Sequence, residues 1–227
     1  MNKYVMMLVT LLIVMQGCVS IESKHKTVEV KEVEQELHQA VQANDIARVK
    51  GMLKTASLDE PNQDGDTALL VAVKNNHIEI SQLLIDAGAN INYQNHQQDS
   101  PYLYAGAEGR TEILRYMLQH ATPDEQVFNR YGGNALIPAA EKGHLNNVRL
   151  LLEESNTDID HQNNFGYTAL IEAIALTDGS KRYQDIVRVL LVQGANQQLK
   201  DNNNKTALDY AKERNYSEMI ALLQYYQ

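Results

Sequence analysis

The segment DGDTALLVA, residues 64–72, places a turn residue, a helix cap and an apolar run in immediate succession. Gly65 is suited to the positive φ of a tight turn because it has no Cβ atom. The Thr67 side chain can accept hydrogen bonds from the free N–H groups at the start of a helix. The run that follows is short and rich in alanine, which lets neighbouring helices approach closely. The segment therefore predicts a tight turn that leads directly into a short, closely packed helix.

The same layout returns four more times along the chain. Its capping position is occupied, at successive steps of 33, 34, 34 and 38 residues from Thr67, by Ser100, Asn134, Thr168 and Thr206. A shorter match over residues 37–40 lies one period before Thr67 but lacks the capping residue. Further apolar runs at helical spacing follow the first helices, and Gly88 and Gly194 end two of these runs. A regular period of this length predicts stacked helix pairs that bury their apolar sides against one another.

The residues around this layout closely resemble the ankyrin repeat. The copy that begins with DGDTAL continues with NHIEI at residues 76–80 and DAGAN at residues 86–90, and similar residues recur over 143–152 and 186–191. The resemblance implies an all-α ankyrin-repeat solenoid with β-hairpin fingers. It implies about five full repeats plus a degenerate N-terminal one, over residues 33–227.

The sequence departs from the repeat pattern at three places. Gln98 stands where the third repeat should have its turn glycine, so we expect a strained or differently shaped hairpin there. Pro138 would remove an early hydrogen bond of the fourth repeat's first helix, which predicts an irregular start. The fifth repeat carries about five extra residues within 176–184, between its two helices.

The first seventeen residues have the layout of an export signal. Lys3 precedes an uncharged run over residues 4–15. Twelve helical residues span about 18 Å, too little for a bilayer core of about 30 Å. The sequence VMQGC at residues 14–18 resembles the lipobox of bacterial lipoproteins, which implies cleavage of residues 1–17 and lipidation of Cys18. The alternative is a non-lipidated export signal with an incidental cysteine.

The lipoprotein resemblance also implies a location. Residues 18–32 would form a lipidated tether on the membrane, and the repeats would follow from residue 33. Val19 is not the aspartate that is usually associated with retention at the inner membrane. We therefore expect an outer-membrane lipoprotein of the bacterial cell envelope that faces the periplasm.

Composition and spacing argue against several classes of function. The formal net charge is −9, and the acidic chain lacks a basic block, so nucleic acid is not an expected partner. His38, His77 and His144 occupy positions where the repeat uses histidine to order a turn or helix start, and the segment DIDH at residues 158–161 falls in a turn between repeats. We expect no catalytic residue, no metal site and no cofactor, and a monomer held together by packing alone.

Repeats of this kind offer an extended concave surface, made by the fingertips and the exposed side of the first helix of each pair. The predicted partner-binding residues are Asp64, Asp66, Lys74, His96, Gln97, Arg130, Tyr131, Glu141, Phe165, Tyr167, Asn202 and Asn203. Aromatic residues and arginine dominate binding energy at protein interfaces, so Tyr131, Phe165 and Tyr167, with Arg130, form the predicted hot spot. The alternative is that Phe165 and Tyr167 pack against each other or against the adjacent finger.

The expected function is that of a non-enzymatic protein-binding lipoprotein. Resemblance to bacterial ankyrin lipoproteins implies two roles: an immunity or inhibitor protein for a toxic effector, or a scaffold that supports a resident periplasmic enzyme. An enzyme would need a titratable cluster in a pocket, and the sequence pattern indicates none.

Overall fold

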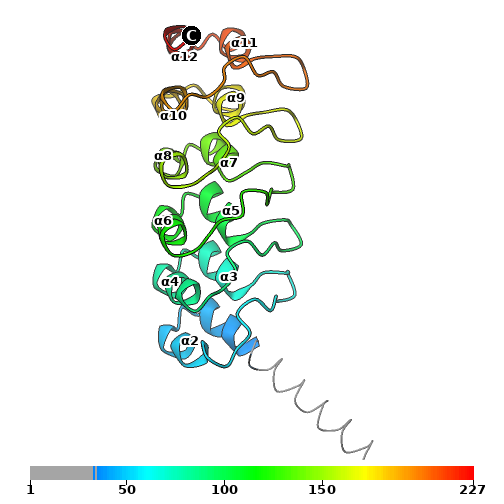
Figure 1. Cartoon of the computed structure of the whole chain (residues 1–227), viewed down its shortest axis with the longest axis vertical. Helices are drawn as coiled ribbons and strands as arrows, with labels where there is room; N and C mark the ends of the chain where they lie inside the picture. Colours follow the sequence, from blue (N-terminus) through cyan, green and yellow to red (C-terminus); the bar gives the residue numbers. More distant parts are fainter. Residues whose placement is uncertain (1–32, 34) are drawn as a thin grey trace, which may run out of the picture.

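The computed structural model describes residue 33 and residues 35–227, which form a stack of paired helices (Figure 1). The first pair consists of a helical stretch over residues 35–42 and α2 (Ile46–Met52). The remaining helices are α3 (Ala68–Lys74), α4 (Ile78–Asp86), α5 (Pro101–Ala107), α6 (Thr111–His120), α7 (Leu136–Glu141), α8 (Leu145–Glu154), α9 (Ala169–Ala175), α10 (Lys181–Val192), α11 (Ala207–Glu213) and α12 (Ser217–Tyr225).

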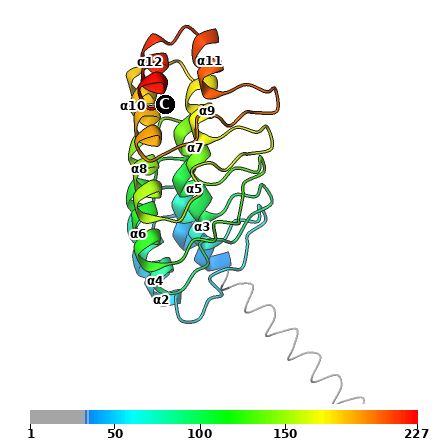
Figure 2. The same ribbon diagram turned by 45° about the horizontal axis from the view of Figure 1, so that its top comes forward.

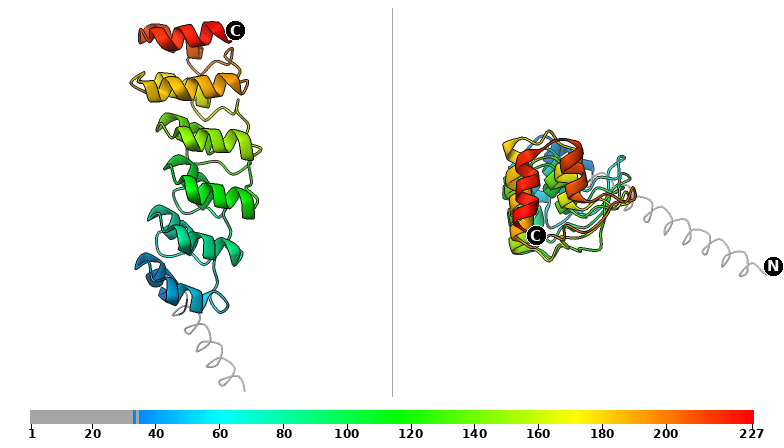
Figure 3. Two further views of the ribbon diagram at one scale, coloured as in Figure 1. Left: turned by 90° about the vertical axis from the view of Figure 1, so that its left-hand side faces the viewer. Right: turned by 90° about the horizontal axis from the view of Figure 1, so that it is seen from above.

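The helices form two layers, and loops project from one side of the stack. The even-numbered helices α2 to α12 form an outer layer, and the odd-numbered helices α3 to α11 form an inner layer between the outer helices and the loops (Figure 2). The outer helices lie one above another when that layer faces the viewer (Figure 3). We call the surface formed by the loops and the exposed side of the inner helices the inner face.

The all-helical repeat fold is confirmed, and the loops of the inner face are hairpin-shaped turns. The described part of the chain contains no β-strand, so the fingers are closed by turn hydrogen bonds and not by a strand ladder. The Cys18 site, the export signal and the tether lie outside the described residues. Within the described residues, no helix combines the length and apolar character that a membrane span requires.

The inner helices begin as their capping residues predict. The hydroxyls of Thr67, Ser100, Thr168 and Thr206 each accept a hydrogen bond from the backbone N–H three residues later, at 3.2 to 3.3 Å. The fourth repeat differs, and the irregular helix start that Pro138 predicts is observed. Its helix α7 begins at Leu136, and Asn134 Oδ1 accepts from the N–H groups of both Leu136 and Ile137.

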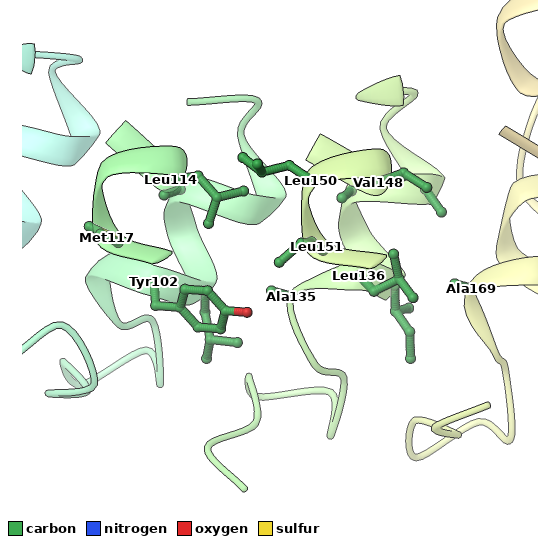
Figure 4. Packing of buried hydrophobic residues seen from close by; sticks show 14 of the residues in the cluster. Tyr102, Leu114, Met117, Ala135, Leu136, Val148, Leu150, Leu151 and Ala169 are labelled. Atoms are coloured by element: carbon green, nitrogen blue, oxygen red, sulfur yellow. The ribbon is translucent and has the colours of Figure 1, made fainter. Parts of the chain in front are cut away.

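The core runs without interruption through the stack. Large apolar side chains alternate with alanines between the layers, and Leu114, Met117, Leu136 and Leu151 are fully buried (Figure 4). The contact between α5 and α7 is especially close, since a Cβ atom placed on Gly106 would lie 2.9 Å from Ala135 Cβ. The small residues predicted at the inner helices are therefore required by the spacing of the repeats.

Of the two expectations for the third finger, a strained turn or a different shape, the structure shows the first: the finger keeps the shape of the others, with Gln98 at positive φ. Gln98 adopts a left-handed conformation with φ of 60°, close to the 74° of Gly132 and the 61° of Asn204 at the equivalent positions. The N–H of Gln98 donates to the Asn95 carbonyl, as the equivalent residues do in the other fingers. The repeat frame imposes this conformation on a side chain that disfavours it.

Candidate partner-binding face

Each finger is organised by one asparagine or aspartate five residues before the helix cap. In the fourth repeat, Asn129 Oδ1 accepts from the N–H groups of Tyr131 and Gly133, at 2.9 and 3.0 Å. The N–H of Asn129 donates to the Gly133 carbonyl at 2.9 Å, which closes the turn. The other fingers repeat this bonding around Asn62, Asn95, Asn163 and Asp201. The backbone of each finger is therefore held by the same set of hydrogen bonds.

Adjacent fingers are also bonded to one another. The N–H of Asn164 donates to the Tyr131 carbonyl at 2.9 Å, and the N–H of Asn202 donates to the Phe165 carbonyl at 3.1 Å. Gln162 Nε2 donates to the Lys200 carbonyl at 2.9 Å. The fingers of the last three repeats thus form one wall beside the inner helices.

A pocket of about 760 Å³ lies between this wall and the inner helices, with a lining that runs from the third repeat to the sixth. It spans four repeats, so no single repeat contains it. Its charged, aromatic and polar lining includes Asp99, Glu108, Arg130, Tyr131, Gly133, Glu141, Lys142, Asn163, Phe165, Tyr167 and Glu172.

Aromatic rings form one side of the pocket. The centroids of Tyr131 and Phe165 lie 6.3 Å apart, and those of Phe165 and Tyr167 also lie 6.3 Å apart. Tyr167 packs edge-on against Tyr210, and the Arg130 guanidinium lies 5.0 Å from the centre of the Tyr131 ring. Tyr131 and Phe165 nevertheless remain 50% and 53% exposed. The rings pack on one another, as the alternative prediction held, and still present a large apolar surface to solvent.

Two carboxylates from the inner helices also line the pocket. Glu172, on α9, is buried, and its Oε1 accepts a hydrogen bond from Asn163 Nδ2 at 2.7 Å. Burial, together with the nearby carboxylate of Glu141, raises the pKa of Glu172 to about 7, although the bond from Asn163 opposes the shift. Glu141 is half-buried on α7. A carboxyl group of Glu172 that titrates near neutral pH is thus placed beside exposed aromatic rings.

Most of the predicted contact residues come together at this pocket. Its lining includes eight of them: Gln97, Arg130, Tyr131, Glu141, Phe165, Tyr167, Asn202 and Asn203. Their role in binding stays a prediction. His96 lies next to them, in a shallower hollow with Gln97 and Arg130.

The predicted contact residues of the second repeat lie apart from the pocket. Asp64 is exposed at its fingertip. Asp66 is buried, where it forms a 2.6 Å ion pair with Lys74 and accepts a 2.6 Å hydrogen bond from Asn95 Nδ2. The Asp66 carboxylate therefore has internal partners.

The sequence prediction missed Glu172 and Asn163. The recurrence of Asn or Asp five residues before every cap was a signal for Asn163. Glu172 lies four residues after its cap, where the other repeats carry Val71, Tyr104, Pro138 and Tyr210. A lone acid at that otherwise uncharged position of the inner helix was the available signal for Glu172.

The DIDH segment has structural contacts. His161 Nε2 donates to the Gly132 carbonyl at 2.6 Å, and its ring stacks on Phe128 with centroids 4.4 Å apart. Asp160 Oδ1 accepts from the N–H of Asn196. Among the described residues, no three His, Cys, Asp or Glu side chains gather in a way that could hold a metal ion.

A stack of helix pairs with turn-built fingers and a lined inner face defines a helical-repeat protein. The family model for ankyrin repeats (3 copies) matches residues 37–130, 92–163 and 136–227. The chain therefore belongs to the ankyrin-repeat family. Ankyrin repeats mediate protein–protein interactions, and proteins built from them are in general non-enzymatic binding scaffolds.

Similar proteins are known over nearly the full repeat region. The chain is 39% identical over 185 residues to the ankyrin-repeat protein YahD of Escherichia coli (strain K12), covering 81% of this chain and 92% of YahD. The solved structure of the ankyrin-repeat protein EF0377 is 57% identical, with a TM-score of 0.83, over 84% of this chain and 97% of that one. An ankyrin-repeat domain of Acinetobacter baumannii AYE is 45% identical, with a TM-score of 0.81, over 85% and 98%.

One distant match is a chain of a solved complex between the predatory endopeptidase Bd0816 of Bdellovibrio bacteriovorus and the immunity protein Bd3460. It is 22% identical with a TM-score of 0.70, over 84% of this chain and 97% of that one. At that identity the match shows the shared fold alone.

Proposed function

We propose that this chain is a non-enzymatic binding protein that captures another protein on its inner face, centred on the pocket beside Tyr131 and Phe165. The observation that carries the proposal is the pair of half-exposed aromatic rings on a wall whose backbone is fixed by hydrogen bonds. Rigid aromatic anchors of this kind commonly supply most of the binding energy of an interface. Because the wall is bonded from finger to finger, little ordering would be needed when a partner binds.

The test is the affinity for a partner captured from the cells that produce this protein. Replacing both Tyr131 and Phe165 with alanine should weaken capture at least tenfold, since a central anchor contributes about 2 kcal/mol or more. The helical signal in circular dichroism should stay unchanged, because both side chains project from turns. The matched control is Val192→Ala, which truncates an exposed apolar side chain of the outer helix α10. Equal capture by all three proteins would contradict the proposal.

We further propose that the protein acts from the bacterial envelope, anchored through a lipidated Cys18 on the outer membrane. In that setting it would serve as an immunity or inhibitor protein that blocks a toxic effector. The alternative is a scaffold for a resident periplasmic enzyme, which predicts weaker binding and a partner whose activity is unharmed.

The anchor has its own test. Replacing Cys18 with serine should release the protein from the membrane fraction or leave it unprocessed, because no acyl chain could then be attached. Cell fractionation and intact-mass measurement would show both effects. Normal maturation with full membrane retention of the variant would contradict lipidation at this position.

A further inference from the structure

The second and sixth repeats differ from the fourth at one pair of positions. These are the residue just before the helix cap and the residue seven places after the cap. In the second repeat they hold Asp66 and Lys74, which form an ion pair at 2.6 Å. In the sixth repeat they hold Lys205 and Glu213, which form an ion pair at 2.8 Å. In the second and sixth repeats, a charge on the inner helix is therefore neutralised within its own repeat.

The fourth repeat has the glutamate of the sixth repeat's ion pair but not its lysine. Glu141 occupies the position of Glu213, but the residue before the cap is Gly133 where the sixth repeat has Lys205. Gly133 lines the pocket, and a Cβ atom placed on it would lie 3.3 Å from Asn129 Nδ2, a close contact that a small shift of the amide would have to relieve. The pocket therefore opens at the place where the internal cation is missing.

Two of the carboxylates that line the pocket have no cationic partner among the described residues. Arg130 lies 3.9 Å from Asp99, and Lys142 pairs with Glu108. Between described residues, neither Glu141 nor Glu172 forms an ion pair. The pocket thus combines two acids that lack a cation with the exposed rings of Tyr131 and Phe165.

We propose that the pocket receives an arginine side chain of the partner protein, which faces Glu141 and Glu172 and stacks against the aromatic wall. The inference rests on the proposed function and names the chemistry of the partner at that site. Arginine suits it better than lysine because its planar guanidinium can bond two carboxylate oxygens and lie flat on a ring. Arg130, stacked on Tyr131 at the rim, shows that these rings accept a guanidinium.

The test uses two small probes on the purified full chain, followed by NMR titration. N-acetyl-L-arginine amide carries the proposed group, and N-acetyl-L-citrulline amide has nearly the same shape without the charge. The arginine probe should shift signals of Tyr131 and Phe165 saturably and bind at least fivefold more tightly than the citrulline probe. Glu141→Gln combined with Glu172→Gln should remove this preference, whereas Glu153→Gln on the outer helix α8 should keep it.

A second, independent test introduces a lysine into the pocket. Gly133→Lys should recreate the ion pair of the sixth repeat, fill the pocket and lower arginine affinity at least tenfold, whereas Gly133→Ala should retain binding. Unfolding curves would confirm that both variants are folded. Equal binding of the two probes, or arginine binding unaffected by the double Gln variant, would overturn the inference. If Tyr131 and Phe165 still proved necessary for partner capture, the proposed function would stand without it.

Discussion

At the scale of single residues, Glu172 is placed at a cost to stability. Its carboxyl group is buried beside a second carboxylate, and both conditions disfavour the charged form. Glutamine would keep the oxygen that accepts from Asn163 and would carry no charge. The acid at this position therefore opposes folding at neutral pH, a cost that is expected if its charge serves the proposed binding.

This cost predicts a pH-dependent difference between the wild type and Glu172→Gln. The folded-state pKa of about 7 lies above the unfolded value of 4.5, so the folded protein binds more protons between these pH values. Stability from this group is fully present below pH 4.5 and is lost as the pH rises through 7. The loss is at most on the order of 3 kcal/mol, and the variant should escape it.

Thermal unfolding at pH 5 and pH 8 would measure the effect. The melting temperature of Glu172→Gln should rise relative to the wild type by several degrees between the two conditions. Glu153→Gln, an exposed acid on α8, should follow the wild type. Parallel pH profiles for wild type and Glu172→Gln would show that the carboxyl group is ionised without penalty.

At the scale of helices and fingers, close packing between inner helices sets the repeat spacing. Gly106 on α5 is buried against Ala135, and Asn147 Nδ2 donates to the carbonyls of Ala105 and Gly106 at 2.9 and 3.0 Å. A helix interior normally gains about 1 kcal/mol when glycine is replaced by alanine. Here the added methyl group would meet a neighbouring helix instead.

We predict that two glycine-to-alanine substitutions change the free energy of unfolding in opposite directions. Gly106→Ala should lower the free energy of unfolding by about 1 to 3 kcal/mol, because its Cβ would lie 2.9 Å from Ala135 Cβ. Gly51→Ala in α2 should raise it by about 0.5 to 1 kcal/mol, because nothing lies within 4 Å of the added atom. Urea unfolding of both variants checks the pair, and stabilisation by both would contradict the close-packed spacing.

The elements were predictable from the sequence to the extent that their signals are local. The caps and Pro138 act within a few residues, and the repeat period is the recurrence of these short signals along the chain; the structure confirms all three. The sequence did not decide between a strained and a reshaped turn at Gln98, whose N–H donates to the Asn95 carbonyl and whose carbonyl accepts from Gln94 Nε2 within the same finger. The Glu172 carboxyl group was missed because its neighbours, Asn163 and Glu141, come from a finger and from another helix. The aromatic residues were found because exposed rings stand out by residue type alone.

At the scale of the whole molecule, the pocket is a property of the stack. Its lining comes from four consecutive repeats, and hydrogen bonds between fingers keep the aromatic wall in register. A substitution that separates neighbouring repeats should therefore weaken partner binding without touching the pocket. The net charge of −9 also favours a partner with basic character, in keeping with the proposed arginine.

The most direct test of the central claim is photo-crosslinking in the cells that produce this protein. A benzophenone amino acid would replace Phe165 on the inner face or Val192 on the outer helix α10, both of which are exposed. We predict one discrete protein adduct at Phe165, identified by mass spectrometry, and none at Val192. Crosslinking of the same partner at Val192 alone, or no adduct at Phe165, would contradict binding at the inner face.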